Sequence, residues 1–106
     1  MNKYLEIKCE ESNDIFKISE QDKCYIINYK WYYWKNKRGN MFICTRVNNI
    51  THYLHDIIMR KSGIRSPSPK HIIVHKNNNT LDNRRENLEW ISKSDNKKRK
   101  EVILEN

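Results

Sequence analysis

The stretch from Val74 to Asn96, VHKNNNTLDNRRENLEWISKSDN, decides how this chain is expected to fold. His71–His75 is an apolar run typical of a β-strand, and Leu88–Ile91 is a second one. A polar loop over 76–87 separates the two runs, and a basic helix is predicted from about Ser94 to Leu104. The predicted order is therefore strand, loop, strand and helix.

The upstream half predicts a small antiparallel sheet. Its expected elements are a strand at Ile15–Ile18, a turn or short helix over 19–22, a strand at Cys24–Ile27, an aromatic strand at Tyr29–Trp34 and a returning strand at Met41–Val47. The polar break that contains Gly39 makes the last two a hairpin. Because side chains alternate along a strand, one pair among the aromatic residues at 31–34 is expected in the core, and the other could contact nucleic acid, although core or hairpin packing is the favoured account of all four.

A short helix is expected next, with Thr51 as its N-cap and an apolar stripe that includes Leu54 and Ile58. His55 lies on that stripe and is expected to be packed. Ser62 and Gly63 end the helix. The sequence thus predicts an α+β protein with a sheet and helix over 1–61, a connecting loop over 62–70 and the strand, loop, strand and helix unit over 71–106.

The charge of the chain is unevenly placed. Its formal net charge is +8, but the first 22 residues carry three Lys against six acidic residues, and the remainder carries eighteen Lys and Arg against seven acids. The segment after Asp22 is therefore at +11. An excess of this kind suits a polyanionic partner, because each cation that neutralises a phosphate releases condensed counterions, although a basic protein can also simply be soluble.

Cys9, Cys24 and Cys44 are odd in number and far apart, without the spacing of a zinc site, so they are expected to be free thiols. There is no apolar run long enough for a signal peptide or a membrane span. The expected location is intracellular, in the cytoplasm, the host nucleus or a virion.

His75, Asn87 and Asn96 follow one another at intervals of twelve and nine residues, around the ungapped string Leu81–Trp90, LDNRRENLEW. This pattern resembles the HNH (His-Me finger) family, in particular the small homing endonucleases of phages and large DNA viruses. The resemblance implies a ββα-metal fold over the C-terminal third and cleavage of phosphodiester bonds in DNA. Weaker similarities upstream extend it over most of the chain.

The resemblance implies a role for each of the three residues. His75 is the general base, because a neutral imidazole can accept a proton from water near pH 7. Asn96 is a ligand of one divalent cation, Mg²⁺ or Mn²⁺, which prefer oxygen donors. Asn87 ties the long loop together and so supports the orientation of the histidine.

Val74 departs from the family pattern, which places Asp or His there as the second metal ligand. A methyl group cannot coordinate a cation, so the ion would depend on Asn96, water and DNA phosphate. Asp82 and Asp95 are alternative carboxylates, but neither stands at the family's ligand position. The Asn-Gly turn after the histidine is also replaced, here by Asn77–Asn79, and Asn tolerates the left-handed backbone that such a turn needs.

Basic residues surround the motif and are predicted to contact DNA phosphate: Lys76, Arg84, Arg85, Lys97, Lys98, Arg99 and Lys100. The partner is expected to be double-stranded DNA, with neither a membrane nor a small-molecule substrate. Two functions remain open. One is a metal-dependent HNH endonuclease or nickase; the other is a catalytically degenerate HNH fold that binds DNA as an architectural or regulatory protein, with a packaging protein as a less favoured variant.

Overall fold

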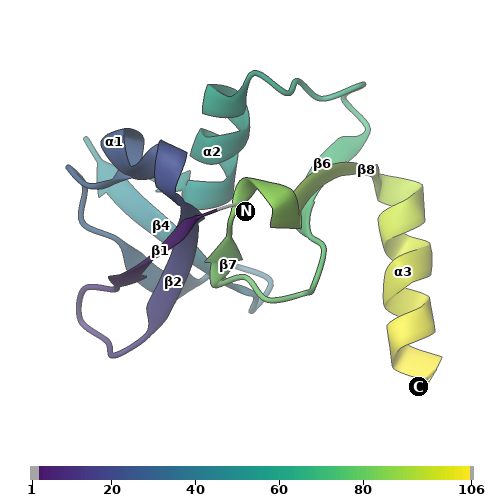
Figure 1. The fold of residues 1–106 in the computed structure, drawn as a ribbon. Helices are drawn as coiled ribbons and strands as arrows, with labels where there is room; N and C mark the ends of the chain where they lie inside the picture. The colour runs from purple at the N-terminus through teal and green to yellow at the C-terminus, as the bar shows by residue number, and fades with distance from the viewer. Residues whose placement is uncertain (1–2, 106) are drawn as a thin grey trace.

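The computed structural model describes the backbone of residues 3–105 and the side chains of residues 3–99. Three α-helices and eight strands make up this part of the chain (Figure 1). In chain order they are β1 (Tyr4–Lys8), β2 (Ile15–Ser19), a 3-10 turn (Glu20–Asp22), α1 (Lys23–Ile26), β3 (Tyr32–Lys35), β4 (Met41–Val47), β5 (Ile50–Tyr53), α2 (Leu54–Ser62), β6 (His71–His75), β7 (Asp82–Asn83), a 3-10 turn (Arg85–Asn87), β8 (Leu88–Ser92) and α3 (Lys93–Glu105). The predicted α+β class is confirmed.

The strands form three small sheets. Strands β3, β4 and β5 form an antiparallel meander, and β6 pairs with β8 in an antiparallel hairpin. The third sheet has the order β1-β2-β7, in which β7 pairs in parallel with β2 through Lys17 with Asp82 and Ile18 with Asn83. Strand β7 comes from the loop of the C-terminal unit. The loop is therefore built into the N-terminal sheet, as Figure 1 shows where the green β7 lies beside β2.

One hydrophobic core joins the β1-β2-β7 sheet, the β3-β4-β5 meander, helix α2 and strand β8 of the C-terminal hairpin. Its buried members are Cys9, Phe16, Ile18, Ile26, Trp31, Ile43, Leu54, Ile58, Met59 and Leu88. Tyr33 packs against this core, whereas Tyr32 and Trp34 stack on each other with ring centroids 4.5 Å apart. The predicted alternation of the aromatic run is therefore confirmed, with Trp31 and Tyr33 on the core side.

The expected single N-terminal sheet is wrong in two places. Cys24–Ile27 was expected as a strand, but residues 23–26 form the helical turn α1, in which only Ile26 is buried. The second difference concerns strand β2. It pairs with β1, a strand that the sequence analysis did not predict, and not with the β3-β4 hairpin. An apolar run of four residues does not distinguish a strand from a helical turn, because neither period is sampled long enough.

Thr51 is not a helix cap. Asn48 and Asn49 both have positive φ, 51° and 66°, as a two-residue hairpin turn requires, and the chain returns as β5 with Thr51 opposite Arg46. Helix α2 begins only at Leu54, after Tyr53 in extended conformation. It ends at Ser62, as the sequence predicted, and Gly63 follows as a C-cap with a left-handed φ of 78°.

Within the described residues, all three cysteines are free thiols, as expected; Cys9 and Cys44 are buried and Cys24 is exposed. None of the helices described has the length and apolar character needed to cross a bilayer. The connection over 62–70 lies between α2 and β6, and Trp90 of β8 closes onto it by donating a hydrogen bond to the carbonyl of Ile64 (3.0 Å).

Candidate active site

His75 is the last residue of β6, opposite Leu88 of β8, and its side chain is buried. Its Nε2 lies 2.9 Å from Oδ1 of Asn83. The amide of Asn83 is itself oriented, because its Nδ2 donates to the carbonyl of Thr80 at 3.0 Å. Oδ1 must therefore accept, so Nε2 of His75 carries the proton and Nδ1 holds the free lone pair.

His75 lines a hollow on the surface of the protein, and no described residue forms a hydrogen bond with its Nδ1. The ring lies against Phe42 and His55, with centroid distances of 6.2 and 5.4 Å. Burial lowers the pKa of His75 below 6.5, although the bond to Asn83 opposes the shift. The imidazole is therefore neutral near pH 7.

Asn87 holds the loop that follows His75. Its Nδ2 donates to the side-chain oxygen of Asn77 (2.9 Å) and to the carbonyl of Asp82 (2.8 Å), and its Oδ1 accepts from the backbone N–H of Asn77 (3.1 Å). These bonds connect both ends of the loop. Asn78, at the turn between them, has the left-handed φ of 62°.

Asn96 lies in the first turn of α3 and lines the same hollow as His75, a depression of about 610 Å³ bordered by β3, β4 and β6. Arg99, one turn later, lines it too. The Nη2 of Arg99 donates to the carbonyls of His75 (2.8 Å) and Lys76 (3.3 Å) and to the side chain of Asn78. The structure thus brings His75 and Asn96 to one hollow, and Arg99 fastens α3 to the loop beside them.

Two of the arginines that were predicted to contact DNA, Arg84 and Arg85, form ion pairs with carboxylates of the protein. Arg84 binds Asp82 through two nitrogens at 2.7 Å and reaches Glu86 at 3.0 Å. Although burial raises the pKa of Asp82, hydrogen bonds from Arg84 and Asn77 hold it below its ordinary value. Arg85 binds the fully buried Asp22 at 2.7 and 3.1 Å. Both guanidinium groups therefore brace the fold.

The other predicted phosphate contacts are on the surface. Lys76, Lys97 and Lys98 are exposed around the hollow, and Arg99 is half-buried. The side chain of Lys100 lies outside the described residues. Contact of these lysines with phosphate stays a prediction.

The lining of the hollow does not fit the divalent cation that the resemblance implies. Among the described side chains, the lining includes the amide of Asn96 and the guanidinium groups of Arg38 and Arg99, but no carboxylate. Val74 stands at the expected ligand position, and residues 3–99 contain no cluster of three or more His, Cys, Asp or Glu side chains suited to hold a metal. A hard dication needs anionic oxygen, so fixed guanidinium charge is the wrong electrostatic environment for it.

The sequence analysis missed Asn83 and the ring contacts of His75. Asn83 is within the string that resembles the family, eight residues after His75, but it was assigned no role there. Phe42 and His55 come from β4 and α2, far away in the sequence, and no spacing pattern points to them.

The comparisons with known proteins bear on this segment. No curated protein and no solved structure matches the chain. Residues 52–98, just under half of the chain, match a family model described as HNH endonuclease. The matched segment runs from β5 to the first turns of α3 and includes His75, Asn83, Asn87 and Asn96, whereas Phe42 and Arg99 lie outside it. The match supports placing residues 52–98 in the HNH endonuclease family.

Proposed function

We propose that this protein is a DNA endonuclease of the HNH kind that nicks one strand, with His75 as the general base. The observation that carries the proposal is the fixed tautomer of His75 at the hollow: Asn83 holds Nε2–H, and no described residue forms a hydrogen bond with Nδ1. A histidine placed only for packing would not need an oriented partner and an open lone pair.

In the proposed reaction, Nδ1 of His75 accepts a proton from water, and the resulting hydroxide attacks phosphorus. The bond from phosphorus to the 3′ oxygen breaks, and the 3′ oxygen takes a proton from solvent. Arg99 supports the phosphate through the guanidinium nitrogens that make no hydrogen bond to described residues. Lys76, Lys97 and Lys98 are the proposed contacts to neighbouring phosphates of duplex DNA.

A second function is favoured by the lining of the hollow. The HNH endonucleases use a divalent metal, and here the described lining holds arginines where that metal needs carboxylate. A chain in this condition can keep its basic surface and bind DNA without cutting it. The second candidate is therefore an architectural or regulatory DNA-binding protein on a degenerate HNH fold.

The two functions are distinguished with supercoiled plasmid incubated with purified protein and Mg²⁺ or Mn²⁺. The first function predicts conversion to open circles by the wild type and none by His75→Ala. His71→Ala is the matched control, because His71 begins the same strand and its ring forms a hydrogen bond with Ser68 (2.7 Å). An inert wild type that still binds duplex, with affinity falling steeply as salt rises, would establish the second function instead.

A further inference from the structure

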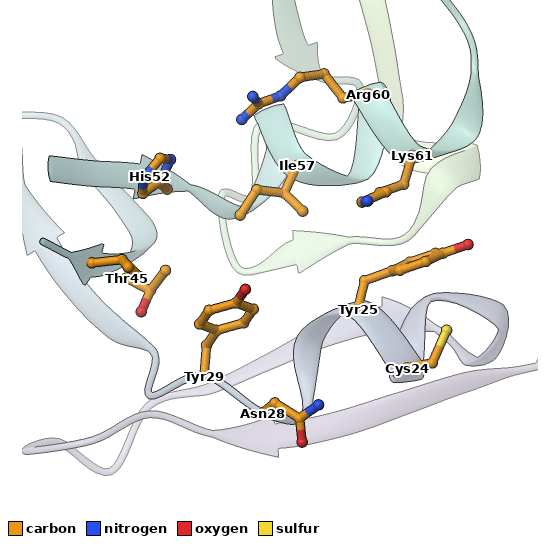
Figure 2. Close-up of a pocket in the computed structure, with 10 residues that line it drawn as sticks. Cys24, Tyr25, Asn28, Tyr29, Thr45, His52, Ile57, Arg60 and Lys61 are labelled. Atoms are coloured by element: carbon orange, nitrogen blue, oxygen red, sulfur yellow. The ribbon is translucent and has the colours of Figure 1, made fainter.

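A second hollow, of about 580 Å³, lies between α1 and α2 (Figure 2). Tyr25 and Tyr29 stand on one side of it, Ile57, Arg60 and Lys61 of α2 on the other, and His52 at one end. It shares no lining residue with the hollow at His75. The two are therefore separate sites.

The tyrosine rings are exposed and held in place. Tyr25 is 36% exposed and Tyr29 is 48% exposed. The ring of Tyr29 makes an edge contact with the buried Trp31, at 6.2 Å between centroids and 71° between planes. This contact with a core residue holds the tyrosine ring in place. Lys61 lies over the ring of Tyr25, 5.3 Å from its centroid. Exposed, fixed rings of this kind are stacking platforms.

The charge at this hollow is positive. Arg60 is exposed, and its Nε donates to the backbone carbonyl of Asp56 at 3.4 Å. Burial raises the pKa of the Asp56 carboxyl, and the charge of Arg60 opposes that rise. Among the described side chains, no carboxylate lines the hollow; Asp56 is on the same helix but outside the lining. An anionic group is therefore favoured beside Arg60 and Lys61.

A neighbouring hollow lies on the other side of Tyr29, which lines both. Its aromatic members are Tyr29 and the stacked pair Tyr32 and Trp34. Its charged members are Lys30, Arg46 and one carboxylate, Glu11. Tyr29 thus lies between two aromatic and basic depressions. We call the surface from Arg60 and Lys61 across Tyr29 to Trp34 the aromatic track.

We propose that the aromatic track binds an unpaired stretch of DNA, with bases stacked on Tyr29 and Trp34 and phosphates next to Arg60 and Lys61. Duplex DNA offers phosphates to such a surface but keeps the faces of its bases stacked within the helix, so the exposed tyrosine rings have no base face to stack on. Stacking on aromatic rings combined with a basic groove is the chemistry that recognises single strands. The proposal concerns binding only and does not depend on cleavage at His75.

The test measures binding of a fluorescein-labelled oligothymidylate of about twelve nucleotides to the wild type by anisotropy in EDTA. The competing probe is a strand of the same length with abasic sites throughout, which keeps the phosphates and lacks the bases. We expect the wild type to bind oligothymidylate at least tenfold more tightly than the abasic strand. Equal affinities would overturn the proposal without any variant having to fold.

Variants then locate the site. Tyr29→Ala should weaken binding of oligothymidylate roughly tenfold, and Tyr29→Phe, which keeps the ring and its contact with Trp31, should not. The control is Tyr4→Ala, since Tyr4 is 45% exposed on β1, outside the track. The charge reversals Arg60→Glu and Lys61→Glu should weaken binding more than Lys8→Glu, which changes net charge equally.

The proposal is wrong if Tyr29→Ala, folded as judged by its melting temperature, binds like Tyr4→Ala. It is also wrong if Lys8→Glu is as damaging as the reversals on α2, because general charge would then explain the binding. Plasmid nicking by the wild type reports separately on His75. A wild type that nicks plasmid but does not prefer oligothymidylate to the abasic strand would therefore reject the aromatic track and leave the proposed function at His75 intact.

Discussion

Asn83 acts on the site through the position of one oxygen. It is fully buried, accepts from Nε2 of His75 and donates to Thr80, and so selects which imidazole nitrogen carries the proton. A partner that fixes the tautomer is as necessary to a histidine base as the ring itself. The sequence alone could not predict this role, because asparagine occurs in turns, in helix caps and as a hydrogen-bond partner of a catalytic base, and the residue type does not distinguish them.

Asn83→Ala should lower the nicking rate nearly to that of His75→Ala while leaving duplex binding unchanged. The physical reason is that the ring loses the acceptor that keeps Nδ1 unprotonated and open. Nitrogen NMR of the histidines gives a readout that a purely structural role would not move: the wild type should show His75 with its proton on Nε2, and the variant a mixture of tautomers. A single unchanged tautomer in the variant would show that Asn83 does not position the base.

Val74 is the other residue at which one substitution is informative. Val74→Asp places a carboxylate beside the hollow next to Asn96, where the described lining has none. We expect Mg²⁺ to raise the melting temperature of the variant and not that of the wild type, because a ligand that binds only the folded state stabilises it. Val74→Asn, polar but uncharged, is the control. Equal Mg²⁺ shifts in all three proteins would mean that position 74 has no part in cation binding.

At the scale of elements, the parallel pairing of β7 with β2 joins the loop after His75 to the N-terminal sheet. Arg85 strengthens the same junction: its backbone N–H donates to Oγ of Ser19 (2.9 Å), and its guanidinium binds Asp22. Both arginines after β7 therefore hold carboxylates of the fold. Contact of any of the predicted basic residues with phosphate stays a prediction.

Arg85→Met should destabilise the protein by about 3 kcal/mol or more, since removal of one partner leaves the buried carboxylate of Asp22 unpaired. Urea unfolding measures this. Lys23→Met is the control, a neighbouring exposed cation. The double variant Arg85→Met with Asp22→Asn should recover part of the loss through their coupling. Additive losses would show that the two side chains do not interact.

The elements that sequence predicted are those with long, regular patterns. Strands β4 and β6 have the predicted bounds, and α2 ends at Ser62 before Gly63, as predicted, because alternation and a left-handed glycine are local signals. Strand β7 was not predictable. Its two residues, Asp82 and Asn83, have little strand propensity and are buried only because Lys17, Arg84 and His75 supply partners.

The candidate site divides in the same way. His75, Asn87 and Asn96 were found from spacing, and the structure brings His75 and Asn96 to one hollow and places Asn87 across the loop. Arg99 was predicted as a phosphate contact but also fastens α3 to the loop through the carbonyl of His75. Contacts of this kind depend on how separate elements pack against one another, and local sequence patterns do not predict that packing.

On the scale of the whole molecule, the partly buried His55 and the buried His75 make the stability of the fold depend on pH. Burial lowers the pKa of His55 to about 3, assisted by the nearby His75, and burial also lowers that of His75. In the unfolded chain both return to about 6.5. Below that pH the unfolded state binds protons that the folded state does not, so stability is complete above pH 6.5 and is lost as the pH falls toward 3.

The free energy of unfolding should therefore decrease below pH 6.5, with a slope of up to about 1.4 kcal/mol per pH unit for each histidine. His55→Phe should remove part of this slope, because a ring of similar shape remains beside Phe42 and Tyr53 but cannot bind a proton. Tyr53→Phe should keep the wild-type slope. Urea titrations at several pH values give the comparison; an unchanged slope in His55→Phe would contradict the assignment.

The contact between Arg85 and Ser19 spans 66 positions, and the β2–β7 pairing spans almost as many. Contacts of such sequence separation form late, because the entropy of closing a long loop must be overcome before they contribute. Asn83 belongs to that pairing, so His75 acquires its oriented partner among the last steps of folding. A chain in which these distant contacts have not yet formed has the whole motif in its sequence but lacks the strand pairing that holds Asn83 beside His75.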